Sequence, residues 1–227
     1  SQKYGALVWS GDIKSSFPSM KNQVAAGLNM GIAGIPWWTT DIGGFFGANI
    51  NDPEFHELLI RWFEYGCFCP VMRLHGYRWP LQPQYGTTGG ATCVSGAPNE
   101  VWSYTDQVCE ILSDYLRLRE RMLPYITELM EEAHEKGTPV MRPLFYDFPE
   151  DKESWNVETE YMFGPKVLVK PITDADARET DVYLPGGASW TNAWTGETFE
   201  GGQKVHVAAP IEQIPLFTRD GYKLPMK

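Results

Sequence analysis

Three apolar runs in the first half of the sequence each end in a polar group that could do chemistry. The runs are residues 4–9, 34–40 and 69–74, and the polar groups are Asp12, Asp41, and Arg73 with His75. If the runs are parallel strands, their carboxyl ends meet at one edge of a sheet, where α/β barrels carry functional groups on loops. Carboxylates at such an edge suit general acid–base catalysis or the binding of hydroxyl groups.

Aromatic side chains cluster at the same points of the sequence. They are Trp9, Trp37, Trp38, Phe45, Phe46, Tyr77 and Trp79. Flat rings pack on the C–H faces of sugars, and carboxylates bind sugar hydroxyls, so the composition favours a sugar-binding cleft. Taken singly, Asp12 and Asp41 are as well explained as turn or helix-cap carboxylates, and His75 as structural. Their coincidence at three successive strand ends favours a site.

The composition excludes several classes of protein. The chain has 227 residues, 43% of them hydrophobic, which is enough to bury one or two cores. Its apolar runs are far shorter than the roughly 20 residues that cross a bilayer, so no membrane span is expected. A net charge of −10 without a Lys/Arg cluster makes nucleic acid an unsuitable partner.

The N-terminus has no apolar segment typical of a signal peptide and runs directly into a predicted strand, so we expect the native start to lie upstream. The cellular compartment stays open. The four cysteines, at positions 67, 69, 93 and 109, lack the C-x-x-C spacing of a redox or zinc pair. We expect free, partly buried thiols, with a Cys93–Cys109 disulfide as an alternative, and neither a metal nor an organic cofactor.

Strands and helices alternate in the first half. Helices are predicted over residues 18–29, over 53–66 after a cap at Asp52, over 99–121, and from Pro124 to Gly137. Residues 77–98 are rich in Gly, Pro and Thr and predict a long loop. This alternation indicates part of a parallel α/β architecture over residues 1–137.

Short β-like runs separated by Pro, Gly and Asp follow Gly137. They are residues 140–145, 167–169, 182–184, 205–207 and 214–217. The change of pattern predicts a separate, small all-β sandwich domain over residues 138–227.

Several blocks of the sequence resemble glycoside hydrolase family 31, in the family's order and spacing. In the first half they are residues 9–12, 34–45, 61–62 and 72–76, and further along they are residues 124–125, 139–143, 161–165 and 182–185. The resemblance covers essentially the whole chain. It implies the C-terminal part, about strands 6–8, of a (β/α)8 TIM barrel, followed by the family's proximal C-terminal β-sandwich domain.

The resemblance also implies roles for residues. Asp12 matches the family's general acid/base, and Asp41 and His75 match residues that bind sugar hydroxyls in subsite −1. Trp9, Trp38, Phe45 and Arg73 are assigned to the same substrate-binding pocket. Burial of Asp12 among aromatic rings and carboxylates would raise its pKa, as a general acid requires.

One departure from the family pattern and one missing block limit these expectations. Phe17 stands where many members have Trp or Tyr, which leaves the aglycone side open. The family's nucleophile Asp block does not occur in the sequence, and we expect it upstream of Ser1. We therefore predict that the chain alone is inactive. Its open barrel part would pair with the remainder of the barrel or with a second copy of the chain.

The predicted activity is hydrolysis of terminal α-linked xylose or glucose from an oligosaccharide or α-glycoside, with retention at the anomeric carbon. The blocks around Trp38 and Arg73 look closer to α-xylosidases than to α-glucosidases. A transglycosidase or lyase of the same family, or a non-catalytic carbohydrate-binding fragment, are the alternatives.

Overall fold

The structure is a computed structural model that describes residues 5–88 and 91–226, without the side chains of residues 84–95. The helices are α1 (Phe17–Ile32), α2 (Pro53–Cys67), α3 (Asp106–Arg121), α4 (Leu123–Lys136) and α5 (Leu144–Asp147), with short 3-10 helices at Val101–Ser103 and Lys152–Trp155. The strands of the first half are β1 (Val8–Trp9), β2 (Trp38–Thr39), β3 (Ala48–Asn49), β4 (Arg78–Trp79), β5 (Gln82–Thr88) and β6 (Ala91–Ser95).

The three apolar runs do lie side by side and parallel, although their strands are shorter than predicted. Strands β1 and β2 pair in parallel, with Val8 opposite Trp38. The third run forms no regular strand, but it follows β2 through the bond from Val71 N to Trp38 O at 3.2 Å and a parallel bridge between Ile42 and Leu74. The carboxyl ends of the three runs therefore share one edge, as the sequence predicts.

Side-chain caps and Gly137 account for the ends of the main helices. Ser16, Asp52 and Thr105 accept hydrogen bonds from the first turns of α1, α2 and α3, which satisfies backbone donors that have no partner within the helix. Gly137 ends α4 with φ 70°, a conformation that costs glycine little. The predicted start of α3 at residue 99 is wrong, because the cap at Thr105 begins the helix later.

The prediction of a long loop over residues 77–98 is wrong, because this segment contains β4, β5 and β6. Strand β4 pairs in parallel with β3, and β5 and β6 form an antiparallel hairpin. The prediction failed because this polar, glycine-rich segment lacks the hydrophobic alternation by which strands are recognised. Its pairing rests on backbone hydrogen bonds.

The second half is a small β-sandwich. Its strands are β7 (Met141–Pro143), β8 (Tyr161–Phe163), β9 (Val167–Val169), β10 (Glu179–Leu184), β11 (Ser189–Asn192), β12 (Thr198–Glu200), β13 (Gln203–Ala208) and β14 (Leu216–Arg219). A six-stranded sheet in the order β12-β11-β14-β9-β8-β7 faces the antiparallel pair β10-β13. The predicted strand over residues 140–145 is partly wrong, because α5 begins at Leu144. Strands β8, β11 and β12 were not predicted.

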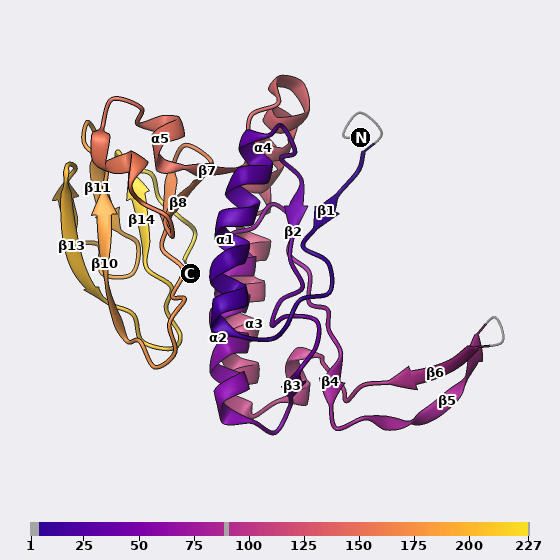
Figure 1. Cartoon of the computed structure of the whole chain (residues 1–227). Helices are drawn as coiled ribbons and strands as arrows, with labels where there is room; N and C mark the ends of the chain where they lie inside the picture. The colour runs from indigo at the N-terminus through magenta and orange to yellow at the C-terminus, as the bar shows by residue number, and fades with distance from the viewer. Residues whose placement is uncertain (1–4, 89–90, 227) are drawn as a thin grey trace.

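Two hydrophobic cores hold these layers together. One fills the sandwich, with Trp190 and Phe217 among its fully buried residues. The other joins the opposite face of the six-stranded sheet, at Tyr161 and Phe163, to the helices. Figure 1 shows the resulting order, with α1, α2 and α3 between β1 and β2 on one side and the sandwich on the other. The helices thus brace the strands that carry the site.

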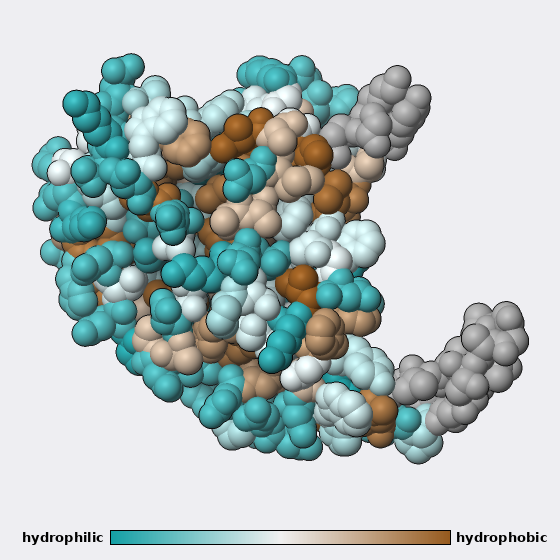
Figure 2. Space-filling model, viewed as in Figure 1, coloured by the Kyte–Doolittle hydropathy of each residue, from teal (hydrophilic) through white to brown (hydrophobic). Residues whose placement is uncertain are grey.

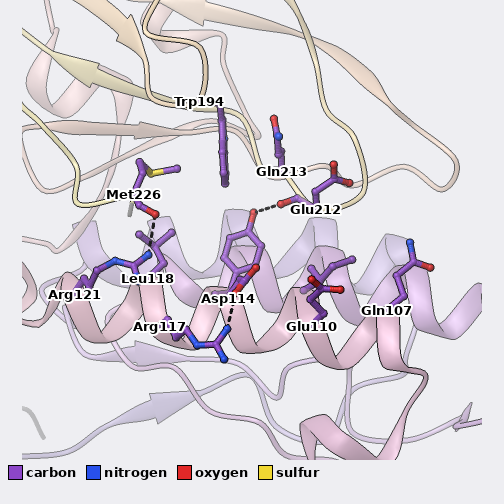
Figure 3. A pocket seen from close by; sticks show the side chains of 12 residues that line it. Gln107, Glu110, Asp114, Arg117, Leu118, Arg121, Trp194, Glu212, Gln213 and Met226 are labelled. Atoms are coloured by element: carbon purple, nitrogen blue, oxygen red, sulfur yellow. Dashed lines mark hydrogen bonds and ion pairs between the residues drawn. The ribbon is translucent and has the colours of Figure 1, made fainter.

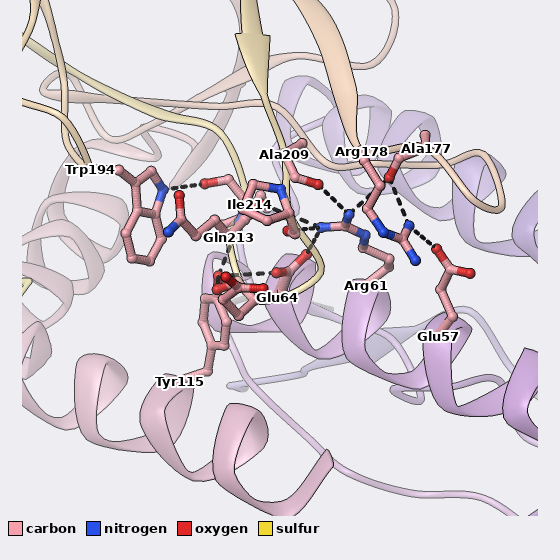
Figure 4. Close-up of polar contacts among 12 residues, drawn as sticks. Glu57, Arg61, Glu64, Tyr115, Ala177, Arg178, Trp194, Ala209, Gln213 and Ile214 are labelled. Atoms are coloured by element: carbon pink, nitrogen blue, oxygen red, sulfur yellow. Dashed lines mark hydrogen bonds and ion pairs between the residues drawn. The ribbon is translucent and has the colours of Figure 1, made fainter. Parts of the chain in front are cut away.

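A buried polar network also fastens the sandwich to α2 and α3 (Figure 4). The Arg61 guanidinium of α2 donates to the carbonyl oxygens of Ala177 and Ala209 at 3.0 and 2.7 Å, and to the Glu64 carboxyl at 3.1 Å. The Tyr115 hydroxyl of α3 lies 3.1 Å from the other Glu64 oxygen. Burial raises the pKa of Glu64 to about 8, although Arg61 and Tyr115 oppose the shift.

Large apolar side chains are exposed on the barrel part of the chain. They include Leu7, Trp9, Phe46, Trp79 and Leu81 in the strands and loops before the hairpin, and Ile32 at the end of α1. In Figure 2, hydrophobic residues are visible on the side of the molecule that carries β1 and β2 in Figure 1. No helix within residues 5–88 and 91–226 is long and apolar enough to cross a membrane.

Candidate active site

Backbone hydrogen bonds tie together the three loops that carry the predicted site residues. Phe45 N donates to Ile13 O at 2.7 Å, directly after Asp12. Tyr77 N in turn donates to Phe45 O, two residues after His75. The loops after β1, after β2 and after residue 74 are therefore one connected surface at the carboxyl edge of the strands.

Asp41 and Arg73 form the charged centre of this surface. Asp41 is fully buried, and its Oδ1 accepts a hydrogen bond from Arg73 Nη2. Two buried polar atoms of this pair have no partner among the described residues, namely Asp41 Oδ2 and Arg73 Nε. A buried polar atom without a partner costs about 1–3 kcal/mol. A ligand can contact the rest of the Arg73 side chain, which is 39% exposed. The Arg73 guanidinium also lies 5.8 Å from the ring of Trp9.

Phe45 and His75 meet beside that pair. Their ring centroids are 5.5 Å apart, and the rings are tilted by 39°. Both residues line an open groove of ≈ 860 Å³, which Tyr77 and Trp102 also border. Phe45 is half-buried and His75 is exposed, so both rings can reach a ligand in the groove.

Arg78 holds the loop that presents Phe45, and sequence reasoning missed it. Its buried guanidinium donates to Gly44 O at 2.9 Å and to Ile42 O at 3.2 Å. Burial lowers the pKa of Arg78. Gly44 has φ 76°, and a Cβ there would lie 2.6 Å from Ser15 Cα, so only glycine fits. In the sequence Arg78 is a single arginine in a polar segment, and most arginines in such segments lie exposed on the protein surface.

Asp12 lies in the turn after β1 and is exposed. The burial that we expected for it among aromatic rings is not provided by the described part of the chain, because neighbouring Trp9 is itself 48% exposed. The Asp12 carboxylate is therefore accessible at the shared edge.

Trp38 does not join the other predicted site residues. It is 4% exposed and packs in the core against α1, where a Cβ on Gly27 would lie 2.8 Å from Trp38 Nε1. Alternate side chains of a strand point to opposite faces, and Trp38 falls on the helix-facing side. The structure thus places Trp38 in the core next to α1, and its assignment to substrate contact stays a prediction.

The described residues contain no group of three or more His, Cys, Asp or Glu side chains that could hold a metal ion. Cys67, Cys69 and Cys109 are free thiols. The side chain of Cys93 lies outside the described residues. Burial raises the pKa of both Cys67 and Cys69 to about 12, which makes these two thiols unreactive at neutral pH.

Family models match both halves of the chain. The glycosyl hydrolases family 31 TIM-barrel domain matches residues 1–129, and the glycosyl hydrolase family 31 C-terminal domain matches residues 137–224. The chain belongs to glycoside hydrolase family 31.

Similar proteins include enzymes named for two sugars. The chain is 38% identical over 225 residues to an α-xylosidase of Saccharolobus solfataricus. The match covers 99% of this chain and 28% of that protein. It is also 35% identical over 221 residues to α-glucosidase 2 of Bacillus thermoamyloliquefaciens, and this match covers 97% of the present chain and 25% of that protein. The chain thus spans about a quarter of the length of these curated relatives.

Among solved structures, a family 31 α-xylosidase from a soil metagenome, complexed with xylose, superposes with a TM-score of 0.95. The sequence identity is 53%, and the match covers 98% of this chain and 33% of that one. Fold and family are shared with this enzyme over nearly the whole of the present chain.

Proposed function

We propose that this chain carries the acid/base half of the active site of a retaining α-glycosidase. The observation that supports the proposal best is the Asp41–Arg73 pair, because the fully buried Asp41 carboxylate fixes an Arg73 side chain that is 39% exposed. The pair belongs to the edge at which Asp12, Phe45 and His75 are tied together. Sugar hydroxyls can accept hydrogen bonds from the exposed guanidinium of Arg73.

The remaining residues have complementary proposed roles. Trp9 and Phe45 supply apolar surface for the C–H faces of the sugar ring. His75 binds a hydroxyl group from the groove that it lines. Asp12, which is exposed at the same edge, faces the glycosidic oxygen. Arg78 acts on Phe45 through Gly44 and is a positioning residue.

The reaction would proceed in two displacements. A partner carboxylate attacks the anomeric carbon while the Asp12 carboxylic acid gives its proton to the leaving oxygen, so the glycosidic bond breaks and a glycosyl ester forms. Asp12, now a carboxylate, then takes a proton from water as that water attacks the anomeric carbon. The ester bond breaks, the sugar leaves with its original configuration, and Asp12 is protonated again.

We propose that the partner carboxylate, about 5–5.5 Å from Asp12 in a retaining enzyme, comes from the remainder of a barrel. Those strands and the bound sugar would also cover Asp12. The printed chain alone would not hydrolyse glycosides. Residues 1–137 would be the barrel part and residues 138–227 the sandwich, a division that the ranges of the two family models support.

An α-xyloside is the preferred substrate class in this proposal. The structure that is 53% identical is described as an α-xylosidase complexed with xylose. Hydrolysis of α-glucosides is the second candidate, because a relative of 35% identity is named an α-glucosidase. Xylose lacks the hydroxymethyl group of glucose, so the choice depends on the space at one corner of the pocket.

A panel of nitrophenyl α-glycosides tests the proposal on the protein expressed from its own gene. We expect hydrolysis of the α-xyloside in preference to the α-glucoside, and NMR of the first product should show the α-anomer. An initial β-anomer would exclude a retaining mechanism. Binding without turnover would favour a non-catalytic carbohydrate-binding protein, and transfer or unsaturated products would indicate a transglycosidase or a lyase.

A further inference from the structure

A second cavity lies between α3 and the sandwich. Its volume is ≈ 560 Å³, within the range of about 300–1,000 Å³ typical of small-molecule sites. Figure 3 shows one face of α3 on one side of it and Trp194, Glu212 and Gln213 on the other. None of the residues that line it also lines the groove at His75. The cavity is therefore separate from the candidate active site.

Trp194 gives this cavity a fixed aromatic wall. Its indole N–H donates to Ile214 O at 2.7 Å, and its backbone N–H donates to Asn192 Oδ1 at 2.9 Å. Figure 3 shows its ring projecting from the sandwich towards α3. A half-buried ring that is already held in place loses little conformational freedom when a flat ligand packs on it.

The positive groups of the cavity are already engaged. Arg117 pairs with Asp114 at 2.7 Å, and Arg121 donates to the carbonyl oxygens of Pro225 and Met226 at 2.8 Å each. An anionic ligand would thus meet no free cation from these two arginines, and it would face the carboxylates of the cavity. Charge argues against phosphates and carboxylates as ligands.

Four polar side chains of the cavity are available to a ligand. The side chains of Gln107, Glu110, Glu212 and Gln213 make no hydrogen bond to another side chain or backbone group in the described part of the chain. Two carboxylates and two amides offer both acceptors and donors, the set that neighbouring hydroxyl groups require. Together with Trp194 they suit a neutral, polyhydroxylated ring with one apolar face.

We propose that this cavity is a second carbohydrate site, which binds one sugar unit of an α-linked oligosaccharide against Trp194. The choice of a sugar rests on the proposed function, whereas the cavity and its free polar groups do not. The second site binds sugar without catalysis. A binding measurement therefore tests the second site, whereas a hydrolysis assay tests the proposed function.

Saturation-transfer NMR can test the site on the protein expressed from its own gene. The probes are methyl α-xyloside, methyl α-glucoside and maltotriose, and an Arg73→Ala background weakens binding at the candidate active site. We expect at least one probe to bind in this background, and its affinity to fall at least about tenfold when Trp194→Ala is added. Hydrolysis of a nitrophenyl glycoside by the single Trp194→Ala variant should stay within about twofold of the wild type.

Trp155→Ala is the matched control, because Trp155 is an exposed sandwich tryptophan whose indole N–H also donates to a backbone carbonyl, Pro149 O at 3.0 Å. If Trp194→Ala fails to fold, the exposed pair Gln107→Ala with Glu110→Ala replaces it, with Glu120→Ala on the same helix as its control. Equal affinities in test and control variants, or no binding of any probe in the Arg73→Ala background, would overturn the second site.

Discussion

Asp41 is a fully buried carboxylate with one satisfied and one unsatisfied oxygen. Folding therefore bears the cost of an incomplete pair. In return, the buried carboxylate fixes the Arg73 side chain, which is 39% exposed and can contact a ligand. Asp12 contrasts with Asp41, since its exposure leaves its environment to be set by what binds there.

Replacing Arg73 tests the pair at the scale of single residues. Arg73→Ala removes the partner of Asp41 Oδ1 and a donor to the sugar, so we expect kcat/KM to fall about ten- to hundredfold, the equivalent of ~1.5–3 kcal/mol. Steady-state kinetics on the protein expressed from its own gene measure this. Lys136→Ala, which removes an exposed ion pair with Glu132, is the control. Equal kinetics for the two variants would contradict the role of Arg73.

The elements with strong local signals were the ones that could be predicted. Helix α2 follows from its cap, Asp52, and strand β9 from its apolar run. The shared edge of Asp12, Asp41 and Arg73 also followed from the order of runs. The two strands of the hairpin β5–β6 are neighbours in the sequence, but they lack the hydrophobic alternation by which strands are recognised, so the pattern did not predict them.

The side of the strand on which Trp38 lies and the binding partners of Arg78 could not be predicted from local sequence patterns either. Whether Trp38 faces the site or α1 depends on the register of a two-residue strand, and a shift of one residue exchanges the two faces. Arg78 binds carbonyl groups more than thirty residues away in the sequence, at Ile42 and Gly44. Nothing near Arg78 in the sequence indicates those partners.

Two glycines of the site loop make a matched test at the scale of elements. Both Gly44 and Gly47 have positive φ, but a Cβ on Gly44 would lie 2.6 Å from Ser15 Cα, whereas one on Gly47 would make only ordinary contact with Lys14 Cγ at 3.7 Å. We expect Gly47→Ala to cost about 1–2 kcal/mol of unfolding free energy. Gly44→Ala should cost about 2–5 kcal/mol, because overpacking adds to the strain.

Urea denaturation compares the two glycine variants, and kcat/KM should fall further in Gly44→Ala because the loop carries Phe45. Equal losses of stability would show that the backbone of Ser15 moves away at no cost, and that this loop is not fixed as described.

At the scale of the whole molecule, Glu64 links the barrel part to the sandwich through Arg61 and Tyr115. Its pKa rises from 4.5 to about 8 on folding, because of burial. Between these values the folded protein holds a proton that the unfolded chain has released. The contribution of Glu64 to stability is therefore present at low pH and is lost as pH rises towards about 8.

Glu64→Gln should remove that pH dependence, because glutamine keeps the shape without a titrating proton. We expect the midpoint of thermal unfolding of the wild type to fall more between pH 5 and pH 8 than that of Glu64→Gln. Calorimetry at the two pH values measures the difference. Parallel pH profiles for the two proteins would show that Glu64 keeps the same charge in the folded and unfolded states.

The exposed apolar side chains of the barrel part make a second prediction for the whole molecule. Leu7, Phe46 and Leu81 are each at least 38% exposed, and surfaces of this kind mark contacts with other protein. We expect the 227-residue chain, expressed alone, to self-associate in size-exclusion chromatography with light scattering. A stable monomer at high concentration would contradict this expectation.

The account depends most on Asp12 as the general acid/base. In the protein expressed from its own gene, Asp12→Ala should lower kcat/KM for an unactivated α-linked disaccharide by about 10²–10⁴-fold. It should slow attack on a nitrophenyl or fluoride glycoside much less, because those leaving groups need no proton. Added azide should then accelerate turnover of the activated substrate, since azide needs no general base. Normal turnover of the unactivated disaccharide by Asp12→Ala would contradict the assignment.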